Sequence, residues 1–575
     1  MRTAVSTLLA VLLAVPWPLA AQAPAKEAPR TTASVELSLF NLDVVVTDSR
    51  GDAVHGLKAE DFEVFHDGKP VRITNFSEIR GTAFPSVSVT PPVEPAPAGA
   101  PATVAPAPEP SVAPQRPRRR IVIFIDRLQL PSPDIRQELF DSLRRLLEES
   151  VEPPDEAMIV TWDRSIETVL PFTSDLAKLD RTLEAMSDLS NRMPEEKAQL
   201  DQLADADAWF TSLANDPRIG TDFGGFTPTA EMSAQQALFE MKAKTQALKG
   251  LAATLGGMEG RKALVLVSHR FSRYAGLEYY LKSRTDVSAL GDPRTRDYDA
   301  KPLLDDLTKT ANANGVTLYA IFPAGMDNPG PKADSNRNDN PDINSQPTGG
   351  REQLSLSNEL EALNYVTGKT GGVAAVGAQN IPSFVDRVAA DLDSWYSLGY
   401  PSPANDGKAA SVQVKVKGRK LNVRVRGSLV EKTLEEQMKD RVLAHLFKPD
   451  ARAKIPIKVT ASLASNLKTD KFRIKVEVQV PIGKLALLPT QKGVAGSFSL
   501  FVAAVGPKGD FSEVSRKSQP FEIPTAELEK ATAGHYTYDF EIETSGPDAR
   551  ICVGIWDEKG GDAGFAVVRP AGPGA

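Results

Sequence analysis

The chain has 575 residues, of which 41% are hydrophobic and 25% are charged, so its length predicts three or four globular domains. The formal net charge of −7 gives no electrostatic footprint for nucleic acid. The single cysteine, Cys552, excludes an intramolecular disulfide and any zinc or iron–sulfur site made of thiolates from one chain. Because it lies in the alternating stretch DARICVGIWDE, we expect Cys552 to be a small buried hydrophobe.

Residues 1–23 have the pattern of a secretory signal peptide. Arg2 is the charged start, an apolar core follows from Ala4 to Val15, and WPLAAQA supplies small residues for cleavage after Ala21 or Ala23. That core is shorter than the roughly 20 residues that span a bilayer, although a retained anchor stays open. We therefore expect a protein that is exported, to the periplasm or beyond, without a membrane span once the signal is removed.

Residues 32–82 predict β-strands. The stretch SVELSLFNLDVVVTD is rich in Val and Leu, and in DFEVFHDGKPVRITNF the Asp67-Gly68 pair between apolar runs predicts a tight hairpin, because both turn positions require φ > 0. Residues 83–117 are mostly Pro, Ala and Val and predict an extended linker. We interpret the basic cluster of Arg116 and residues 118–120 as the edge of this linker, not as a binding patch.

Residues 118–395 alternate apolar strands with helices. The buried strand 121–125 precedes a helix at about 134–149, a long helix covers about 232–256, and KALVLVS is the next buried strand. Continuous apolar strands between helices are typical of a sheet covered on both faces. The sequence therefore predicts an α/β fold with a doubly wound, mostly parallel sheet.

The rest of the chain returns to strands. Residues 396–430 contain a few strands, 431–453 predict a helical linker, and 454–570 contain strands at the spacing of a β-sandwich. Since a sheet of two or three strands is marginal in water, we expect 32–82 and 396–430 to form one sandwich with the α/β domain inserted between them.

Several segments resemble a known family. They are VVVTDSRGDAVHGLKAEDFEVFHDGKPVRITNF, DEAMIVTWDRSIETVLPFTSD, GRKALVLVS and WYSLGYPSPANDGKAASVQVKVKGRKLNVRVR, and with the helices between them they cover most of 32–430. They resemble bacterial secreted proteins with a von Willebrand factor A domain, of the type common in acidobacteria. The resemblance implies an A-type domain flanked by β modules, exported, with a binding role and no known partner.

The resemblance also implies a divalent-cation site, but the ligand pattern is degenerate here. The family pattern is Asp-x-Ser-x-Ser at the end of the first strand, a distant Thr, and an Asp after a later strand. Asp126 matches the first Asp, whereas Leu128 and Leu130 stand in place of the two serines. After LVLVS the chain has His269-Arg270 instead of Asp-Gly, and Thr221 and Thr227 are loose candidates for the Thr.

We therefore predict no functional metal and no cofactor. Apolar side chains replace two hydroxyl donors, and an imidazole is a poor ligand for a hard cation. Asp126 should instead be hydrogen-bonded or ion-paired, with Arg127, His269 or Arg270 as partner. Two other segments predict no ligand site: 327–350 lacks the calcium-loop spacing, and the glycines of 223–232 lack a Gly-Lys-Ser/Thr sequence.

Three functional hypotheses follow. The first is a non-catalytic protein-interaction or adhesion module whose contact edge comprises Asp126, Arg127, Ser268, His269 and Arg270. The second is a hydrolase-type enzyme with an Asp126/His269 dyad and Ser268 as nucleophile, although neighbouring residues on a strand end point to opposite sides. The third is a metal-dependent adhesin with non-standard ligands. The partner protein, the pathway and the oligomeric state stay open.

Overall fold

The computed structural model describes most of the chain in twelve stretches. These are residues 39–81, 118–130, 133–187, 228–268, 271–277, 293–322, 349–376, 381–401, 409–448, 454–468, 471–506 and 512–571. The expected signal peptide, the linker at 83–117 and most of the insertion at 327–350 lie outside these ranges. No helix among the described residues is long and apolar enough to cross a membrane.

The strands of the first β-sandwich come from the chain segments before and after the α/β domain. One four-stranded sheet has the order β13-β1-β11-β4 and the other β14-β12-β2-β3. The strands are β1 (Leu39–Thr47), β2 (Phe62–His66), β3 (Lys69–Val71), β4 (Asn75–Arg80), β11 (Ser394–Pro401), β12 (Ala410–Val416), β13 (Asn422–Arg424) and β14 (Ser428–Leu429). Asn41 pairs with Gly399 and Val64 with Val414. The two segments thus form one shared sandwich, as expected from the small number of strands in each segment.

The hairpin between β2 and β3 has the predicted turn. Asp67 and Gly68 have φ values of 49° and 75°, the left-handed conformations that a two-residue turn of this hand requires. Phe62 and Val64 on β2 are buried against Tyr396 and Tyr400 of β11, so the alternation of the strand places one face in the core.

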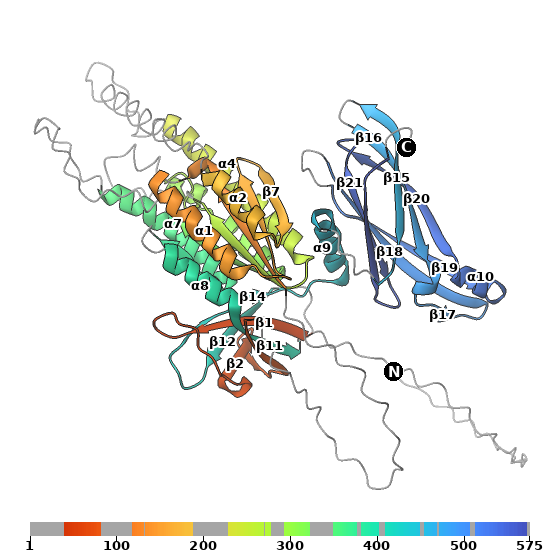
Figure 1. The fold of residues 1–575 in the computed structure, drawn as a ribbon, viewed down its shortest axis with the longest axis horizontal. Coiled ribbons are helices and arrows are strands. Elements are labelled where there is room, and N and C mark those ends of the chain that lie inside the picture. Colours follow the sequence, from red (N-terminus) through yellow and green to blue (C-terminus); the bar gives the residue numbers. More distant parts are fainter. Residues whose placement is uncertain are drawn as a thin grey trace, which may run out of the picture. The chain divides into compact units, whose positions relative to one another are not determined.

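The α/β domain, whose β7, α1, α2, α4, α7 and α8 are labelled in Figure 1, is built on one sheet. This sheet has six strands in the order β10-β9-β8-β5-β6-β7. The strands are β5 (Arg119–Asp126), β6 (Glu156–Trp162), β7 (Ile166–Thr173), β8 (Arg261–Val267), β9 (Val316–Phe322) and β10 (Ala374–Val376). All pairings are parallel except that of β7, which runs antiparallel to β6 at the edge. The predicted class, α/β with a mostly parallel sheet, is confirmed.

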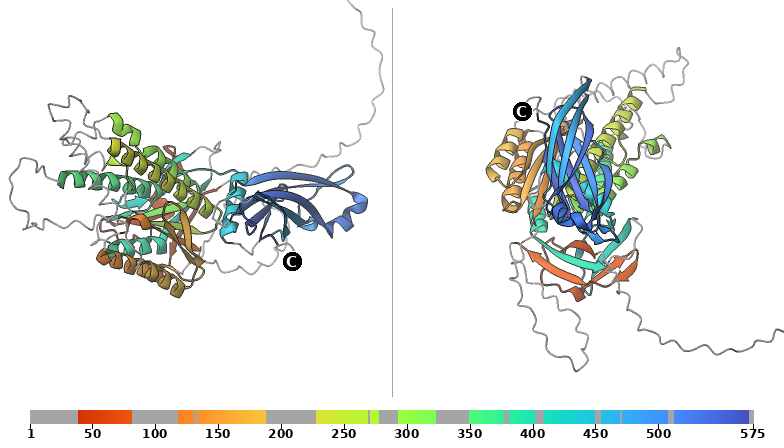
Figure 2. Two further views of the ribbon diagram at one scale, coloured as in Figure 1. Left: turned by 90° about the horizontal axis from the view of Figure 1, so that it is seen from above. Right: turned by 90° about the vertical axis from the view of Figure 1, so that its right-hand side faces the viewer.

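Helices cover both faces of this sheet (Figure 2). One face carries α4 (Pro228–Gly256), α6 (Lys301–Ala313) and α7 (Gly349–Thr370), and the other carries α1 (Pro133–Ser150), α2 (Leu176–Ser187) and α8 (Ile381–Asp393). Successive side chains of β5 enter the two cores in turn: Val122 and Phe124 face α4, whereas Ile123 and Ile125 face α1. A strand that is buried on both faces explains the continuous apolar run.

The arginines before this run are part of the strand, which corrects the interpretation of 118–120 as a linker edge. Arg119 and Arg120 belong to β5 and are 4% and 5% exposed. Arg119 donates from Nε to Asp155 Oδ2 over 2.9 Å, and Arg120 donates from Nη1 to Glu156 Oε2 over 2.9 Å. Asp155 directly precedes the neighbouring β6 and Glu156 is its first residue, so both ion pairs lie at the amino-terminal edge of the sheet.

The C-terminal part is a second sandwich. A three-stranded sheet has the order β15-β16-β20, and a second sheet has the order β17-β18-β21-β22 with β19 paired to β18. The strands are β15 (Lys458–Lys468), β16 (Lys471–Pro481), β17 (Leu488–Pro489), β18 (Gly493–Val505), β19 (Ser515–Pro524), β20 (His535–Thr544), β21 (Arg550–Asp557) and β22 (Ala563–Val568). A short helix, α10 (Leu528–Thr532), precedes β20.

The expected helical linker is a packed helix. In α9 (Leu434–Phe447), Met438, Val442 and Leu446 are buried against β18 and β21 of the second sandwich. Cys552 lies in the same cluster and is fully buried, as its alternating segment predicted. Thr433 caps the helix through a capping box with Glu436, which fixes the start of α9.

Candidate functional site

The site lies where the order of the parallel strands reverses. From β5 the chain continues to β6 on one side, and β8 pairs with β5 on the other side. In open α/β sheets, ligands bind outside the carboxyl ends of the strands at such a switch point. Here β5 ends at Asp126, and Ser268 directly follows β8.

Asp126 caps the turn that follows its strand. Its Oδ1 accepts a hydrogen bond from the Leu128 amide over 3.2 Å, which holds the 3₁₀ turn Arg127–Gln129 against the end of β5. Leu128 and Leu130 are 4% and 1% exposed and pack into the cores on opposite faces of the sheet. The two leucines thus cover the end of β5 with apolar side chains on both faces of the sheet.

The other oxygen of Asp126 is bound by an internal ammonium group. Lys244 Nζ of α4 lies 2.5 Å from Asp126 Oδ2 and donates to Ser268 Oγ over 3.1 Å. Ser268 in turn donates its hydroxyl proton to Asp126 Oδ2 over 2.8 Å. Asp126, Lys244 and Ser268 are 1%, 5% and 1% exposed. The three side chains form a buried network, which we call the Lys244 cluster.

The helix α4 places this lysine by its periodicity. Met241, Leu248, Leu251 and Leu255 form the core-facing stripe of the helix, all between 0% and 4% exposed. Lys244 lies three residues after Met241 and four before Leu248, and so occupies this same stripe. The buried ammonium is tolerated because a carboxylate and a hydroxyl accept its protons.

The residues present do not fit a divalent cation. A hard cation needs several oxygen ligands in near-octahedral arrangement, but here the ammonium of Lys244 already contacts Asp126 Oδ2, and Leu128 and Leu130 offer no donor atoms. In the described part of the chain, no three His, Cys, Asp or Glu side chains are grouped as metal ligands would be. The other candidate ligands, Thr221, Thr227 and His269, lie outside the described residues.

The structure gives Asp126 an ion-pair partner that the sequence did not suggest. Asp126 is ion-paired, but with Lys244 of a distant helix and not with the adjacent Arg127. His269 and Arg270 lie outside the described residues. Arg127 instead lines a pocket on the α1–α2 side of the sheet.

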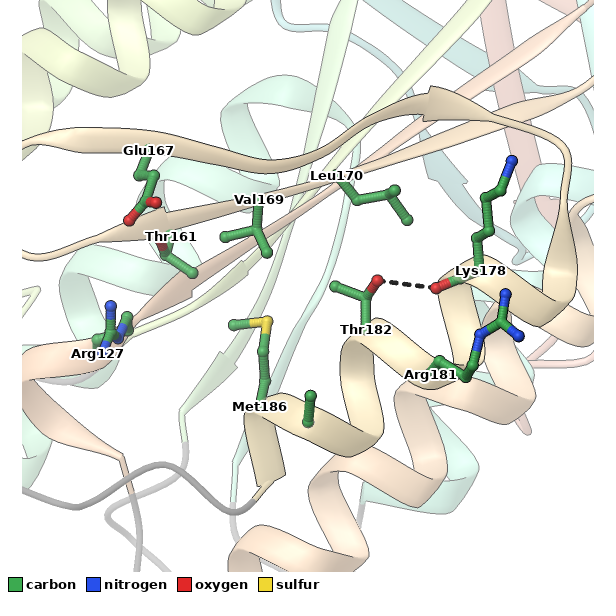
Figure 3. A pocket seen from close by; sticks show the side chains of 10 residues that line it. Arg127, Thr161, Glu167, Val169, Leu170, Lys178, Arg181, Thr182 and Met186 are labelled. Atoms are coloured by element: carbon green, nitrogen blue, oxygen red, sulfur yellow. Dashed lines mark hydrogen bonds between the residues drawn. The ribbon is translucent and has the colours of Figure 1, made fainter. Parts of the chain in front are cut away.

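This pocket has a volume of about 500 Å³ and lies between α2 and the strands β6 and β7, of which β7 is the edge strand. Its lining residues are Arg127, Thr161, Glu167, Val169, Leu170, Lys178, Arg181, Thr182, Ala185 and Met186. Figure 3 shows Arg127 at one end, Lys178 and Arg181 at the other, and the apolar side chains of Val169, Leu170 and Met186 between them. We call this feature the β7 pocket.

The sequence did not single out Lys244 or the residues of the β7 pocket. A signal for Lys244 was available, because a lone lysine in the apolar stripe of a long helix is expected to find a buried counter-charge. The pocket had no such signal, because its residues come from β5, β6, β7 and α2 and are ordinary for exposed strands and helices.

Comparison with known proteins gives distant structural likenesses. No family model and no curated protein matches the sequence. An aerotolerance-related membrane protein from Bacteroides fragilis, solved with multiple mutations to serine, matches 48% of this chain and 98% of its own length at 12% identity and a TM-score of 0.21. The vWF domain of the type V pili tip protein Mfa5 from Porphyromonas gingivalis matches 48% of this chain and 94% of its own at 11% identity and a TM-score of 0.23. The PilB minor pilin from Streptococcus sanguinis, solved as a point mutant, matches 49% and 63% at 10% identity and a TM-score of 0.25.

Proposed function

We propose that this protein is an exported, non-catalytic protein-interaction module whose α/β domain binds its partner without a divalent cation. The observation that carries the proposal is the ammonium of Lys244 on Asp126 Oδ2, with Ser268 completing the cluster. The positive charge at the end of β5 thus comes from a side chain of the protein and not from a bound metal ion. Partner binding therefore requires neither loading nor exchange of a metal ion.

The Lys244 cluster also argues against the hydrolase hypothesis. A serine nucleophile needs a base that accepts its proton and a substrate that reaches its oxygen. Ser268 is 1% exposed and gives its proton to Asp126, and Lys244 acts as donor to both neighbours and so is not placed as a base. The proposed role of Ser268 is to complete the hydrogen bonds of a buried ion pair.

Export is the second element of the proposal. It rests on the charged start, apolar core and small-residue cleavage region of residues 1–23. Mass spectrometry of the cellular protein should find an N-terminus near Gln22 or Pro24. An intact N-terminus that begins at Met1 would contradict cleavage.

The test of metal independence is partner capture from envelope extracts on immobilised mature protein. We expect the same captured protein, in the same amount, in EDTA and in buffer with Mg²⁺ or Mn²⁺. The cations should also leave the thermal unfolding of the free protein unchanged. Capture that disappears in EDTA and returns with metal, and that is lost in Asp126→Ala, would support the metal-dependent adhesin instead.

A further inference from the structure

The β7 pocket combines two features that a binding site for an acidic peptide needs. It presents three cationic side chains, Arg127, Lys178 and Arg181, against a single carboxylate, Glu167. Between the cations lies an apolar floor that includes Val169, which is 41% exposed. Charges at both ends of an apolar strip match a ligand with acids at both ends of an apolar segment.

The charges of the pocket are largely available to a ligand. Within the described part of the chain, the side chains of Arg127 and Arg181 form no ion pair. The Lys178 ammonium lies 3.3 Å from the carboxylate of Asp175, which directly precedes α2, but both groups are solvent-exposed, and such a pair is weak and exchangeable. An incoming carboxylate thus meets two uncompensated guanidinium groups and a partly compensated ammonium.

The edge of the sheet favours an extended ligand. β7 is the last strand of the sheet order, and in the described residues it pairs with β6 alone. Its outer edge therefore offers backbone donors and acceptors to an added strand. Because side chains of an extended peptide alternate, every second one would lie on the α2 side, toward the pocket.

We propose that the β7 pocket binds an extended acidic segment of a partner protein, with carboxylates at its two ends and apolar side chains between them. This inference rests on the proposed function, since it names the ligand chemistry of the same binding domain. The carboxylates pair with Arg127 at one end and with Lys178 and Arg181 at the other. The apolar side chains cover Val169, Leu170 and Met186.

The test uses a fluorescein-labelled peptide, Glu-Glu-Leu-Ser-Val-Leu-Glu-Glu, and fluorescence anisotropy with the mature full-length protein in EDTA. Three companion peptides replace the glutamates by glutamine, the glutamates by lysine, or the apolar residues by serine. We expect saturable binding of the first peptide alone, weakened at least fivefold when salt rises from about 50 to about 500 mM, because exposed charge pairs are screened. Binding of the glutamine peptide with equal affinity, or no saturable binding of the glutamate peptide, would overturn the proposal.

The variants locate the binding. Arg181→Glu and Lys178→Glu change exposed side chains of α2, and each should weaken the glutamate peptide by about fivefold to tenfold, since one attraction becomes a repulsion. Val169→Asp should weaken it similarly by placing a charge on the apolar floor. The matched control is Lys309→Glu on α6, an exposed lysine on the opposite face of the sheet, which should leave the affinity unchanged. Equal affinities of Arg181→Glu, Lys178→Glu and wild type would refute this location.

Failure of this inference and failure of the proposed function give different results. If partner capture needs metal while the peptide still binds in EDTA, the proposed metal independence is wrong and the β7 pocket stands. If capture is metal-independent but the same Arg181→Glu protein captures the partner normally, the module stands and the pocket is not its site. Displacement of the peptide by sebacate at concentrations equal to those of unlabelled peptide would identify a small dicarboxylate ligand and overturn the peptide proposal.

Discussion

Replacing Lys244 by methionine removes the charge from the Lys244 cluster while keeping most of the buried side-chain volume. Asp126 would then be a buried carboxylate with two remaining hydrogen bonds, from the Leu128 amide at 3.2 Å and the Ser268 hydroxyl at 2.8 Å. Breaking a buried ion pair by removing one partner costs about 3–5 kcal/mol. Because two donors remain, we expect Lys244→Met to lower the stability of the α/β domain by about 3 kcal/mol.

The reverse change and the double variant test whether the loss comes from the pair. Asp126→Asn leaves the buried ammonium of Lys244 without its carboxylate and should also destabilise by several kcal/mol, roughly as in other broken buried pairs. In the double variant Lys244→Met/Asp126→Asn no charge is buried alone, so its loss should be smaller than the sum of the two single losses by about 2–3 kcal/mol.

The assay must resolve the α/β domain, because a chain of several domains does not unfold in one step. Amide hydrogen exchange of peptides covering β5 and α4, measured across a urea series, gives the local free energy of unfolding. Lys242→Met is the matched control: it changes an exposed lysine of the same helix and should stay within about 0.5 kcal/mol of wild type. A neutral Lys244→Met, or strictly additive single losses, would refute the role of Lys244 as internal counter-ion.

Three further predictions concern buried groups elsewhere. Burial lowers the pKa of Lys262 from 10.5 to about 8, so between these two pH values the unfolded state holds a proton that the folded state lacks. The free energy of unfolding should therefore rise with pH in this range, by up to about 1.4 kcal/mol per pH unit. Urea unfolding of the protein and of a Lys262→Met variant, which lacks this titration, measures the difference. Burial also raises the pKa of the Cys552 thiol to about 12, so Ellman's reagent near neutral pH should leave the native protein unlabelled and label one thiol in guanidinium chloride; rapid native labelling would contradict this packing. Arg119→Ala should lower the stability of the α/β domain by about 3–5 kcal/mol in hydrogen exchange of β5 and β6, because Asp155 is fully buried at the other end of the pair, and a neutral result would show that Asp155 is held by other donors.

The sequence predicted the α/β domain well because its strands are buried on both faces. Such strands must be apolar throughout, as Ile121 to Ile125 are, and the helices between them carry a clear stripe. The shared first sandwich was also predictable, since neither segment had enough strands to be stable alone. Turn chemistry gave the hairpin at Asp67 and Gly68, because few residue pairs adopt two positive φ values.

The site was predictable only in part. Asp126 was singled out by its position at the end of a buried strand, and the structure places it there in a buried ion pair. The cationic partner of Asp126 could not be found in the same way. Lys244 belongs to a different element and comes 118 positions later in the chain (244 − 126). The sequence offered Arg127, His269 or Arg270 as partner, and the structure shows an ion pair with Lys244 and not with Arg127.

The basic cluster before β5 was misread for a related reason. Consecutive arginines are mostly solvated, and the linker that precedes them strengthened that interpretation. Arg119 and Arg120 are nonetheless buried, because Asp155 and Glu156 at the start of β6 neutralise them across the parallel pairing. A charge pattern within one segment cannot show a counter-charge on the next strand of the sheet.

The Lys244 cluster and the β7 pocket are connected through the turn that Asp126 caps. One oxygen of Asp126 holds the Leu128 amide, while the other is held by Lys244 and Ser268. The carboxylate therefore ties helix α4 on one face of the sheet to the turn from which Arg127 extends toward the pocket on the other face. Where a metal ion would make this geometry depend on cation supply, an ammonium on a buried helix keeps it fixed. The Lys244 cluster thus pre-organises one end of the proposed peptide site, and a pre-organised cation loses less entropy when it pairs with a ligand carboxylate.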